Sequence, residues 1–342
     1  MIKENYNLIE KYLHYFILNN KIISELIFDL EKKIFLKKKN YANEKHIFIS
    51  GLARSGSTLL LNILYQSGNF CSLTYNDMPM ILAPNLWSKF IGRKKKNFKL
   101  EKRAHQDMVN INIYSPESFE EVFWKYILKN KYIDKNLIKD IKIPEKIIVE
   151  YSRYINLICE KNKKNNYLSK NNNSLFRIEK ILNFFQNSYF IIPFRDPYTH
   201  AYSLLSQHQR FIKLQKNNDF IKDYMNWLGH HEFGLNHKTF DFKQKNNLNL
   251  NKNSINYWIK IWIDYYTYVL NNYKKSKNQK RIILVNYNKL CDNKNNILKS
   301  LSDNIGIDEL NNKIKITSQK KQIKIECDNL LLEKANKIYS KL

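Results

Sequence analysis

A short stretch near residue 50 constrains the fold more than any other part of the chain. Residues 46–49 are mostly β-branched or aromatic, and the run is too short for a helix, so it indicates a buried strand. Gly51 and Gly56 bracket the turn that follows, where a missing Cβ lets backbone approach a ligand closely. Ser57 and Thr58 then open an apolar helix whose first N–H groups and positive dipole end face the turn. The stretch therefore predicts an anion cradle, most naturally for phosphate.

The spacing of this turn is close to the Walker A pattern G-x-x-x-x-G-K-[ST], with one departure. Ser57 stands where that pattern has the lysine that reaches the β- and γ-phosphates. We therefore expect a nucleotide that keeps one phosphate in the cradle, with Arg54 as a cation aimed from another direction. The alternative is a plain strand-turn-helix with no ligand. An arginine, two serines and a threonine within five residues favour the phosphate site.

Strand-like and helix-like segments alternate along the 342 residues. Apolar runs at 70–75, 167–171, 189–194 and 281–285 indicate further strands, separated by helical patterns. This alternation predicts an α/β fold with a central parallel sheet flanked by helices, P-loop-like and with helical insertions. We expect a single domain over 1–342, with a helical leader at 1–40 and a helical insertion at 78–165.

The bulk composition limits the partners of the chain. Lys and Arg number 58 against 31 Asp and Glu, a formal charge of +27, which would suit a nucleic-acid or anionic-surface binder. The lysines crowd connectors and no nucleic-acid motif is present, so we favour a compositional bias and expect no specific nucleic-acid partner. No window is long enough for a membrane span. Four scattered cysteines favour a reducing cytoplasm, and no metal-ligand cluster is evident, since His230-His231-Glu232 fits a loop better than a metal site.

A second anion clamp is predicted near residue 195. The strand 189–194 runs into Arg195-Asp196-Pro197 and then a helix, and Ser203 lies about two helical turns beyond the arginine. An arginine and a hydroxyl near one point can hold an anion. The alternative is an Arg195–Asp196 pair that ties the loop.

The predicted strand ends also offer groups for proton transfer. Asp77 follows the strand 70–75, and ligands bind at the carboxyl ends of parallel strands, so Asp77 is a candidate general base. The alternative is an Asp that caps the following helix. His105 and His208 are rival bases.

Together these motifs resemble the sulfotransferases that use 3′-phosphoadenosine 5′-phosphosulfate (PAPS). The family's [PA]-[RK]-S-G-[ST]-T loop matches residues 53–58, and its R-D-P turn with a serine eight residues beyond the arginine matches Arg195-Asp196-Pro197 and Ser203. The resemblance covers roughly residues 45–290. It looks closer to the tyrosylprotein and carbohydrate-type members, because the C-terminal R-K-G motif of the small-molecule cytosolic branch is absent.

The resemblance implies a role for each matching residue. Arg195 and Ser203 would bind the 3′-phosphate, and Lys170, at the end of the strand 167–171, would stabilise the transferring group with Arg54. Asp77 falls close to the family's glutamate base. Tyr287 resembles the tyrosine of a Y-E-x-L strand end, with Asn288 in place of the acidic residue. The loop that would hold the 5′-phosphosulfate consists of Arg54, Ser55, Gly56, Ser57, Thr58 and Leu59.

The implied function is transfer of a sulfonate group from PAPS to a hydroxyl or amine of an acceptor such as a carbohydrate, lipid or peptide. This chemistry requires no metal, and PAP would be the other product. Two other classes stay open: a P-loop kinase or ATPase, which would need the missing Walker lysine, and a basic binding module without catalysis.

Overall fold

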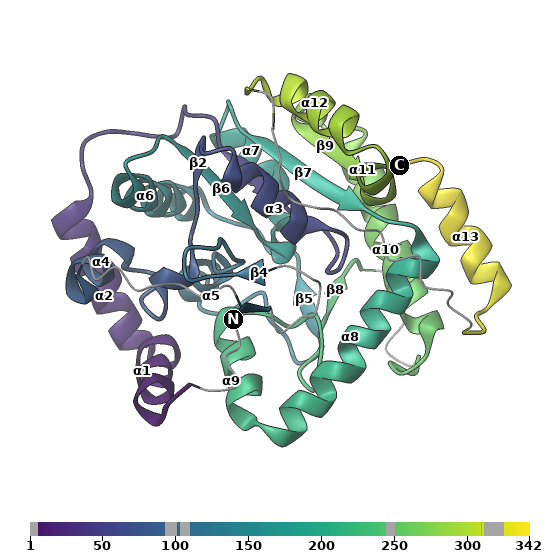
Figure 1. The fold of residues 1–342 in the computed structure, drawn as a ribbon, viewed down its shortest axis with the longest axis horizontal. Helices are drawn as coiled ribbons and strands as arrows, with labels where there is room; N and C mark the ends of the chain where they lie inside the picture. The colour runs from purple at the N-terminus through teal and green to yellow at the C-terminus, as the bar shows by residue number, and fades with distance from the viewer. Residues whose placement is uncertain (1–5, 93–100, 103–109, 244–249, 309, 311–324) are drawn as a thin grey trace.

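The computed structural model describes residues 6–92, 101–102, 110–243, 250–308, 310 and 325–342. Its centre is a five-stranded sheet in the order β2-β6-β1-β7-β9, and every neighbouring pair in it is parallel (Figure 1). This confirms the predicted α/β class with a central parallel sheet flanked by helices. The strands are β1 (Ile47–Ile49), β2 (Phe70–Cys71), β6 (Asn166–Lys170), β7 (Tyr189–Phe194) and β9 (Ile282–Asn286).

Alternate side chains on the strands enter two different cores. On β1, Ile47 and Ile49 pack on one face of the sheet against α3 (Ser57–Gln66), α11 (Tyr287–Asp292) and α12 (Lys294–Ile305). Phe48 enters the larger core on the other face, where α6 (Glu145–Asn162), α7 (Ile178–Phe184) and α10 (Ile255–Tyr273) contribute. Because a strand has a side-chain period of two and both faces are covered, the strands read as continuous apolar runs.

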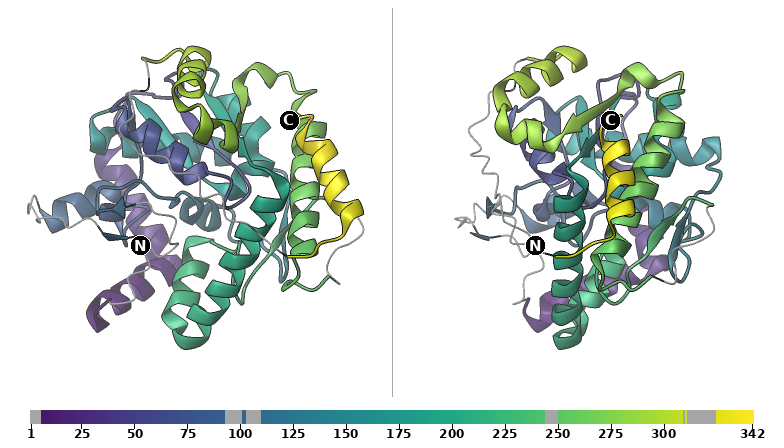
Figure 2. Two further views of the ribbon diagram at one scale, coloured as in Figure 1. Left: turned by 45° about the vertical axis from the view of Figure 1, so that its right-hand side comes forward. Right: turned by 90° about the vertical axis from the view of Figure 1, so that its right-hand side faces the viewer.

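The helices outside the sheet layers extend the larger core. At the amino terminus, α1 (Leu8–Asn19) contacts α9 (Asp219–Leu228), and α2 (Lys21–Phe35) contacts α4 (Pro84–Ile91), α5 (Glu121–Ile127) and α6. At the other end, α13 (Asn329–Tyr339) lies along α10 and α8 (Pro197–Asn217), as Figure 2 shows. Across the described ranges, no helix is both long and apolar enough to cross a bilayer.

The described residues between β2 and β6 form helices and short strands. Besides α4, α5 and α6 this segment holds the 3₁₀ turn η1 (Tyr75–Asp77), the antiparallel pair β3 (Glu101–Lys102) and β4 (Asn110–Ile111), and β5 (Leu137–Lys139). The strand β5 pairs in parallel with β8 (Thr239–Asp241), outside the main sheet. Two further 3₁₀ turns, η2 (Asn172–Arg177) and η3 (Gln279–Arg281), lie after β6 and before β9.

A buried ion pair anchors the middle of the larger core. The Arg177 guanidinium donates to both carboxylate oxygens of Glu121, at 2.7 and 3.0 Å, and stacks on the Trp124 and Tyr132 rings. Burial opposes ionisation of Glu121, but the Arg177 charge and the hydrogen bonds outweigh it and keep the pKa of that carboxyl below its usual value. Asn171, directly after β6, also donates to Glu121 at 2.7 Å, so this pair fixes the backbone where β6 ends.

Candidate functional site

The turn after β1 has the strand, glycine turn and helix that its sequence predicts. The strand ends at Ile49 and α3 begins at Ser57, and both Arg54 (φ 69°) and Gly56 (φ 101°) adopt left-handed backbone. Gly56 is the N-cap of α3 and has no side chain to cap the first-turn N–H groups, which lack intrahelical partners in any helix. The geometry suits an anion at the positive end of α3.

The loop is attached to α8 by two side-chain contacts. Arg54 Nε donates to Ser203 Oγ at 3.3 Å, and His200 Nε2 lies 2.8 Å from the carbonyl oxygen of Ala53. Burial lowers the pKa of His200 to about 3, so the imidazole is neutral and its Nε2–H donates to Ala53. The structure thus brings together Arg54 of the first predicted clamp and Ser203 of the second.

Tyr287 joins the loop to Arg195. A Cβ added to Gly56 would lie 2.3 Å from Cδ2 of Tyr287, so the ring packs directly on the glycine. The Arg195 guanidinium lies over the same ring, 5.2 Å from its centroid. Burial raises the pKa of Tyr287 to about 12, against the opposing effect of the Arg195 and Arg54 charges. Tyr287 opens α11 instead of ending a strand, and this position lets it contact both clamps.

Besides Nδ1 of His200, two buried polar atoms of this site lack a hydrogen-bond partner among the described residues. They are the hydroxyl of Ser55, inside the loop, and Nε of Arg195, at the end of β7. Buried donors without a partner are rare in folded proteins because each costs its desolvation free energy. Ser55 precedes Gly56 in the loop, and Arg195 lies over the Tyr287 ring that packs on Gly56. The two groups come from separate segments and fit a ligand with two separated anionic groups. The Asp196 carboxylate accepts from Thr199 N at 2.9 Å and caps α8.

Lys170 lies beside the base of the loop. It is the last residue of β6, in register with Ile49 of β1, and it is buried. Its carbonyl oxygen accepts a hydrogen bond of 2.8 Å from the Ser118 hydroxyl. Its ammonium charge acts on Glu232, in the loop after α9: burial opposes ionisation there, but His230, Lys170 and the Asn172 amide lower the pKa of Glu232 to about 2.

The sequence did not indicate that Glu232 lies near Lys170. Asn172 Nδ2 donates to Glu232 Oε1 at 2.7 Å, and His230 Nδ1 lies 3.7 Å from Glu232 Oε2. In the sequence, Glu232 could be noticed only as the charged residue of the Gly-His-His-Glu run at 229–232. Nothing in the spacing of that run predicts that it lies next to the end of β6. The part of the chain that the structure describes holds no group of three or more His, Cys, Asp or Glu side chains placed to bind a metal ion.

Asp77 lies at the end of η1 and is buried. Its Oδ2 accepts from Thr74 N at 2.8 Å and from Thr74 Oγ1 at 3.0 Å, while Oδ1 accepts from Lys161 Nζ on α6. These are the contacts of a capping-box carboxylate that closes η1 from its third position. The helix that follows Asp77, α4, has Ala83 at its N-cap, so Asp77 does not cap that helix as the alternative expected. Within the described chain, its side-chain hydrogen bonds go to Thr74 and Lys161 and not to the loop after β1.

Of the two histidines considered as alternative bases, His105 and His208, the structure describes only His208. His105 lies outside the described residues. His208 is buried on α8, where its Nδ1 accepts from Gly234 N at 3.2 Å and its ring packs against His237 and Trp258. Burial, and then the Lys252 charge, lower the pKa of His208 to about 4. It is a neutral core histidine, and its described contacts are not with Arg54 or Lys170.

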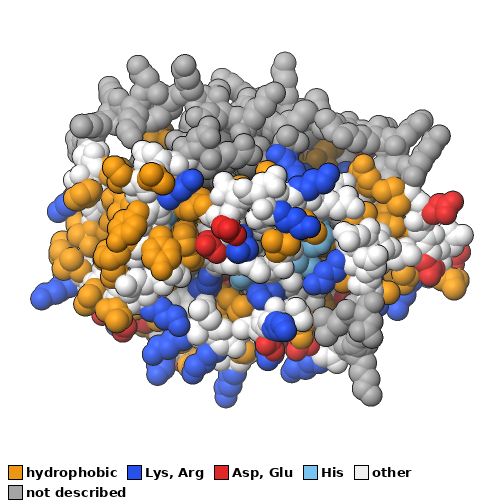
Figure 3. Space-filling view, turned by 90° about the horizontal axis from the view of Figure 1, so that it is seen from below, with side chains coloured by type: hydrophobic (Ala, Val, Ile, Leu, Met, Phe, Trp, Pro, Cys, Tyr) orange, Lys and Arg blue, Asp and Glu red, His pale blue; other side chains and the backbone are white. Residues whose placement is uncertain are grey.

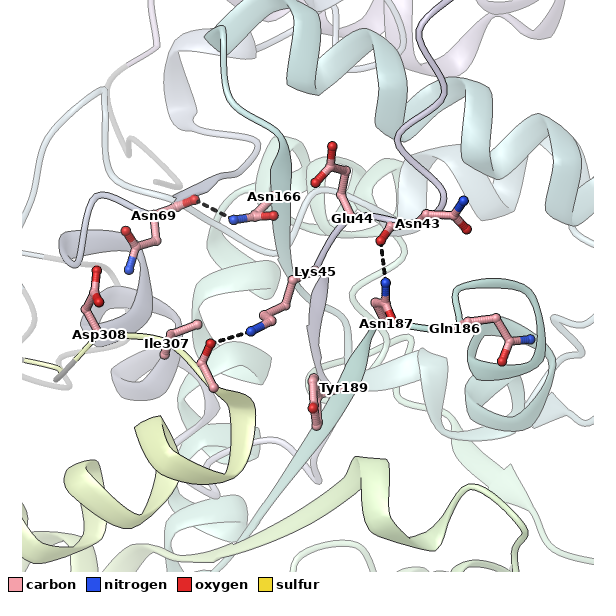
Figure 4. A pocket seen from close by; sticks show the side chains of 11 residues that line it. Asn43, Glu44, Lys45, Asn69, Asn166, Gln186, Asn187, Tyr189, Ile307 and Asp308 are labelled. Carbon is pink, nitrogen blue, oxygen red and sulfur yellow. Dashed lines mark hydrogen bonds between the residues drawn. The ribbon is translucent and has the colours of Figure 1, made fainter.

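A polar hollow of about 520 Å³ lies at the other end of the sheet (Figure 4). Its lining comes from the residues before β1 and the first residues of β6 and β7, including Lys45, Asn166 and Tyr189. In Figure 4, Lys45 donates to the Gly306 carbonyl and Asn187 to the Asn43 carbonyl across this hollow. The hollow is at the amino ends of strands whose carboxyl ends carry Lys170 and Arg195, so it is separate from the site.

Comparison with known proteins identifies the family. A model of the sulfotransferase family matches residues 46–239, a range that contains the loop, Lys170, Arg195 and Ser203. The chain belongs to the sulfotransferase family. No curated protein sequence matches it.

Several solved structures are similar to this chain at low identity. Three of them are sulfotransferase STF1 from Mycobacterium tuberculosis H37Rv (13% identity, 90% of this chain and 79% of that one, TM-score 0.46), sulfotransferase STF9 from Mycobacterium avium (10%, 99% and 79%, 0.48) and the sulfotransferase domain from the curacin biosynthetic pathway (15%, 86% and 96%, 0.42). At these scores the assignment to the family rests on the family model.

Proposed function

We propose that this sulfotransferase takes its sulfonate group from PAPS and transfers it to a hydroxyl or amine of an acceptor. The observation that carries the proposal is the meeting of the two clamps: Arg54 contacts Ser203, and Tyr287 packs on both Gly56 and Arg195. PAPS carries two separated anionic groups, a 3′-phosphate and a 5′-phosphosulfate. The two unpartnered buried atoms, on Ser55 and Arg195, support a ligand of this kind.

In this proposal the loop and the helix α3 bind the 5′-phosphosulfate. The residues from Arg54 to Leu59 supply backbone N–H groups, hydroxyls and one guanidinium, which suit an anion at a helix N-terminus. Arg195 and Ser203 bind the 3′-phosphate, and Tyr287 fixes the distance between the two sites. We also propose that the chain is related more closely to the tyrosylprotein and carbohydrate-type sulfotransferases than to the small-molecule cytosolic branch.

The reaction is an in-line displacement at sulfur. The acceptor oxygen or nitrogen forms a bond to sulfur as the bond from sulfur to the bridging phosphate oxygen breaks, and PAP leaves with that electron pair. Arg54 and Lys170 offset the charge that develops on the bridging oxygen and the sulfonate, and each fixed donor of this kind is worth roughly 2.7–4 kcal/mol. A base takes the acceptor's proton, and Asp77 remains the candidate that we propose for it.

A ligand screen tests the nucleotide. The purified chain is melted with PAP, ATP or NAD, and we expect PAP to raise the melting temperature most, because a ligand at 100 times its Kd adds about 2.7 kcal/mol to the free energy of unfolding. A larger shift with ATP, together with phosphate release, would favour the kinase or ATPase class. No shift with any nucleotide, together with steeply salt-dependent binding to a polyanion, would favour a non-catalytic basic module.

An activity screen tests the transfer. PAP formation from PAPS is followed with a panel of sugar, lipid, peptide and amine acceptors, and we expect one class to raise the rate above that of PAPS alone. A glycan or a lipid hydroxyl is the acceptor we propose first. A cytoplasmic site of action remains a prediction from the scattered cysteines.

A further inference from the structure

The outward face of α1 is apolar. Its most exposed large side chains are Leu8 (84%), Ile9 (79%), Tyr12 (69%), Tyr15 and Phe16. Their spacing of one, four, seven and eight residues from Leu8 puts them on one side of a helix. The inward side packs on α9, where His14 contacts Phe220 and Tyr224. A helix on a protein surface ordinarily turns polar residues outward, so this arrangement needs a partner.

The helix α2 repeats the pattern beside α1. Ile22 (71%), Leu26 (63%), Leu30 and Ile34 are exposed at every fourth position, while Phe28 is buried against α5 and α6. The two helices follow each other in the chain and contact each other, and both lie at one end of the molecule (Figure 1). We call the exposed apolar side chains of these two helices the amino-terminal apolar face.

The position of this face can be followed in Figure 3. Hydrophobic side chains gather on the left of that view, over the end of the molecule formed by α1 and α2, with Lys and Arg side chains around them. The largest apolar patch on a monomeric soluble protein is rarely more than a few hundred Å² and is often a binding site. Nine large apolar side chains on two adjacent helices indicate such a site.

The positive charge of the chain favours an anionic partner for this face. At +27 the protein repels a second copy of itself and is attracted to an anionic surface. Lys21, Lys33 and Lys38 are exposed on and directly after α2. The exposed acids on α2 are Glu25 and Asp29, and Asp29 is paired with Lys32 at 3.0 Å. Apolar side chains bordered by lysines are typical of helices that lie in the interface of an anionic bilayer.

We propose that the amino-terminal apolar face seats the protein on the surface of a bilayer that contains anionic lipid. Leu8, Ile9, Ile22 and Leu26 enter the acyl boundary, while the tyrosines of α1 lie at headgroup level, where their hydroxyls stay hydrated. The lysines lie against the lipid headgroups. The proposal goes beyond sulfonate transfer and does not depend on it.

Vesicle sedimentation with the full chain tests the proposal. Vesicles of phosphatidylcholine alone are compared with vesicles that contain phosphatidylserine as well, and we expect binding to the anionic vesicles. The double variant I9S/F16S should lower the partition coefficient at least tenfold, because both side chains are on the exposed face. Leu330→Ser is the matched control: Leu330 is 77% exposed on α13, at the other end of the chain, and its replacement should leave binding unchanged.

Three results would overturn the proposal. The first is no binding to anionic vesicles, and the second is equal binding by I9S/F16S, which would mean that charge alone holds the protein on the surface. The third is a dimer, seen by light scattering, that I9S/F16S converts to a monomer, since a second copy would then occupy the face. Melting temperatures of the variants near that of the wild type establish that each result reports the surface and not unfolding.

Discussion

Arg54 Nε donates a hydrogen bond of 3.3 Å to Ser203 Oγ, across 149 residues of sequence. The contact joins the loop after β1 to the second turn of α8, so the two motifs of the site are held at one place. His200, on the same helix as Ser203, adds a hydrogen bond to the loop through Ala53. The helix α8 therefore fixes the loop conformation as well as carrying Ser203.

Replacement of Arg54 by glycine should remove most of the transfer activity. Because Arg54 has a φ of 69°, glycine can adopt the same backbone without strain, and what is lost is the side chain with its hydrogen bond to Ser203. We expect the rate of PAP formation to fall about 10²–10³-fold with an unchanged melting temperature, by analogy with the loss of one fixed oxyanion donor. Arg54→Lys keeps the charge and should retain part of the rate. A variant Arg54→Gly with near wild-type turnover would remove Arg54 from the reaction.

Arg195 should determine the preference for a 3′-phosphate. Its guanidinium lies over Tyr287 with a buried Nε that has no partner among the described residues, so it can donate to an anion. In Arg195→Ala, PAP should bind about 10- to 100-fold more weakly, as expected for lost hydrogen bonds to a charged group. Adenosine 5′-phosphate, which lacks the 3′-phosphate, should bind as before, and calorimetry measures both. Arg153→Ala, on the exposed side of α6, is the control.

Equal weakening of PAP and adenosine 5′-phosphate in Arg195→Ala would contradict this role. It would show that Arg195 supports the fold of the site and does not select the phosphate.

Much of the sheet and both loops of the site could be predicted because they depend on local sequence. The strand β7 has the bounds 189–194 that its apolar run indicates, and the helix α3 follows Gly56 directly. Short apolar runs bounded by glycine, proline or charged residues determine these elements locally. The strand β2 is shorter than predicted, Phe70–Cys71, because the chain turns into η1 once Thr74 caps it.

The partners of the polar side chains could not be predicted in the same way. Asp77 and Lys161 are 84 residues apart, and Lys170 and Glu232 come from β6 and the loop after α9. Nothing local fixes such pairs, since lysines and asparagines occur throughout this sequence. They form only when η1 packs against α6, and when the loop after α9 packs against the carboxyl end of β6. The position of Tyr287 on Gly56 likewise depends on the path of α11.

Gly56 should tolerate no side chain, because Tyr287 occupies the space. A Cβ on Gly56 would lie 2.3 Å from the Tyr287 ring, and φ is 101°. Gly68 is the matched control, with φ 78° and no atom within 4 Å of an added Cβ. Gly68→Ala should cost only the left-handed backbone penalty, roughly 1–2 kcal/mol. Gly56→Ala should cost more in urea denaturation, and it should also weaken PAP binding.

Adding Tyr287→Ala to Gly56→Ala separates the cost of the ring contact from the cost of the left-handed backbone at Gly56. In the Gly56→Ala background it should recover the part of the stability that the ring contact costs. Equal losses of unfolding free energy in Gly56→Ala and Gly68→Ala would mean that the Tyr287 ring moves aside without destabilising the protein.

Asp77→Asn distinguishes a base from a cap. The substitution keeps a side-chain oxygen for Thr74 but leaves the Lys161 ammonium without its carboxylate. An unpaired charge costs about 3–5 kcal/mol when it is fully buried, and the partly exposed Lys161 should cost less than that. Lys161→Met in the same chain removes that charge and should restore the melting temperature. If Asp77 is the base, the double variant stays inactive in PAP formation while PAP still binds. Wild-type turnover by the stable double variant would show that Asp77 only caps η1.

Acid should destabilise the protein below about pH 6.5 through its buried histidines. Burial lowers the pKa of His200 to about 3, whereas an unfolded histidine titrates near 6.5. Between these values the unfolded chain binds a proton that the folded chain does not, so the free energy of unfolding falls as pH falls. The contribution of His200 between pH 7 and pH 5 is about 2 kcal/mol.

The contribution of His200 to the pH dependence can be tested by itself, because a glutamine side chain can replace its Nε2–H donor. In His200→Gln, the amide nitrogen can replace Nε2 as the donor to Ala53, and the variant has no group to protonate. Urea denaturation at pH 7 and pH 5 should therefore show a stability loss that is smaller by about 2 kcal/mol than in the wild type. Carboxylates titrate in both proteins and cancel in the comparison. Identical losses in the two proteins would mean that His200 is protonated in the folded state at pH 5, and the Ala53 contact would then need a charged imidazole.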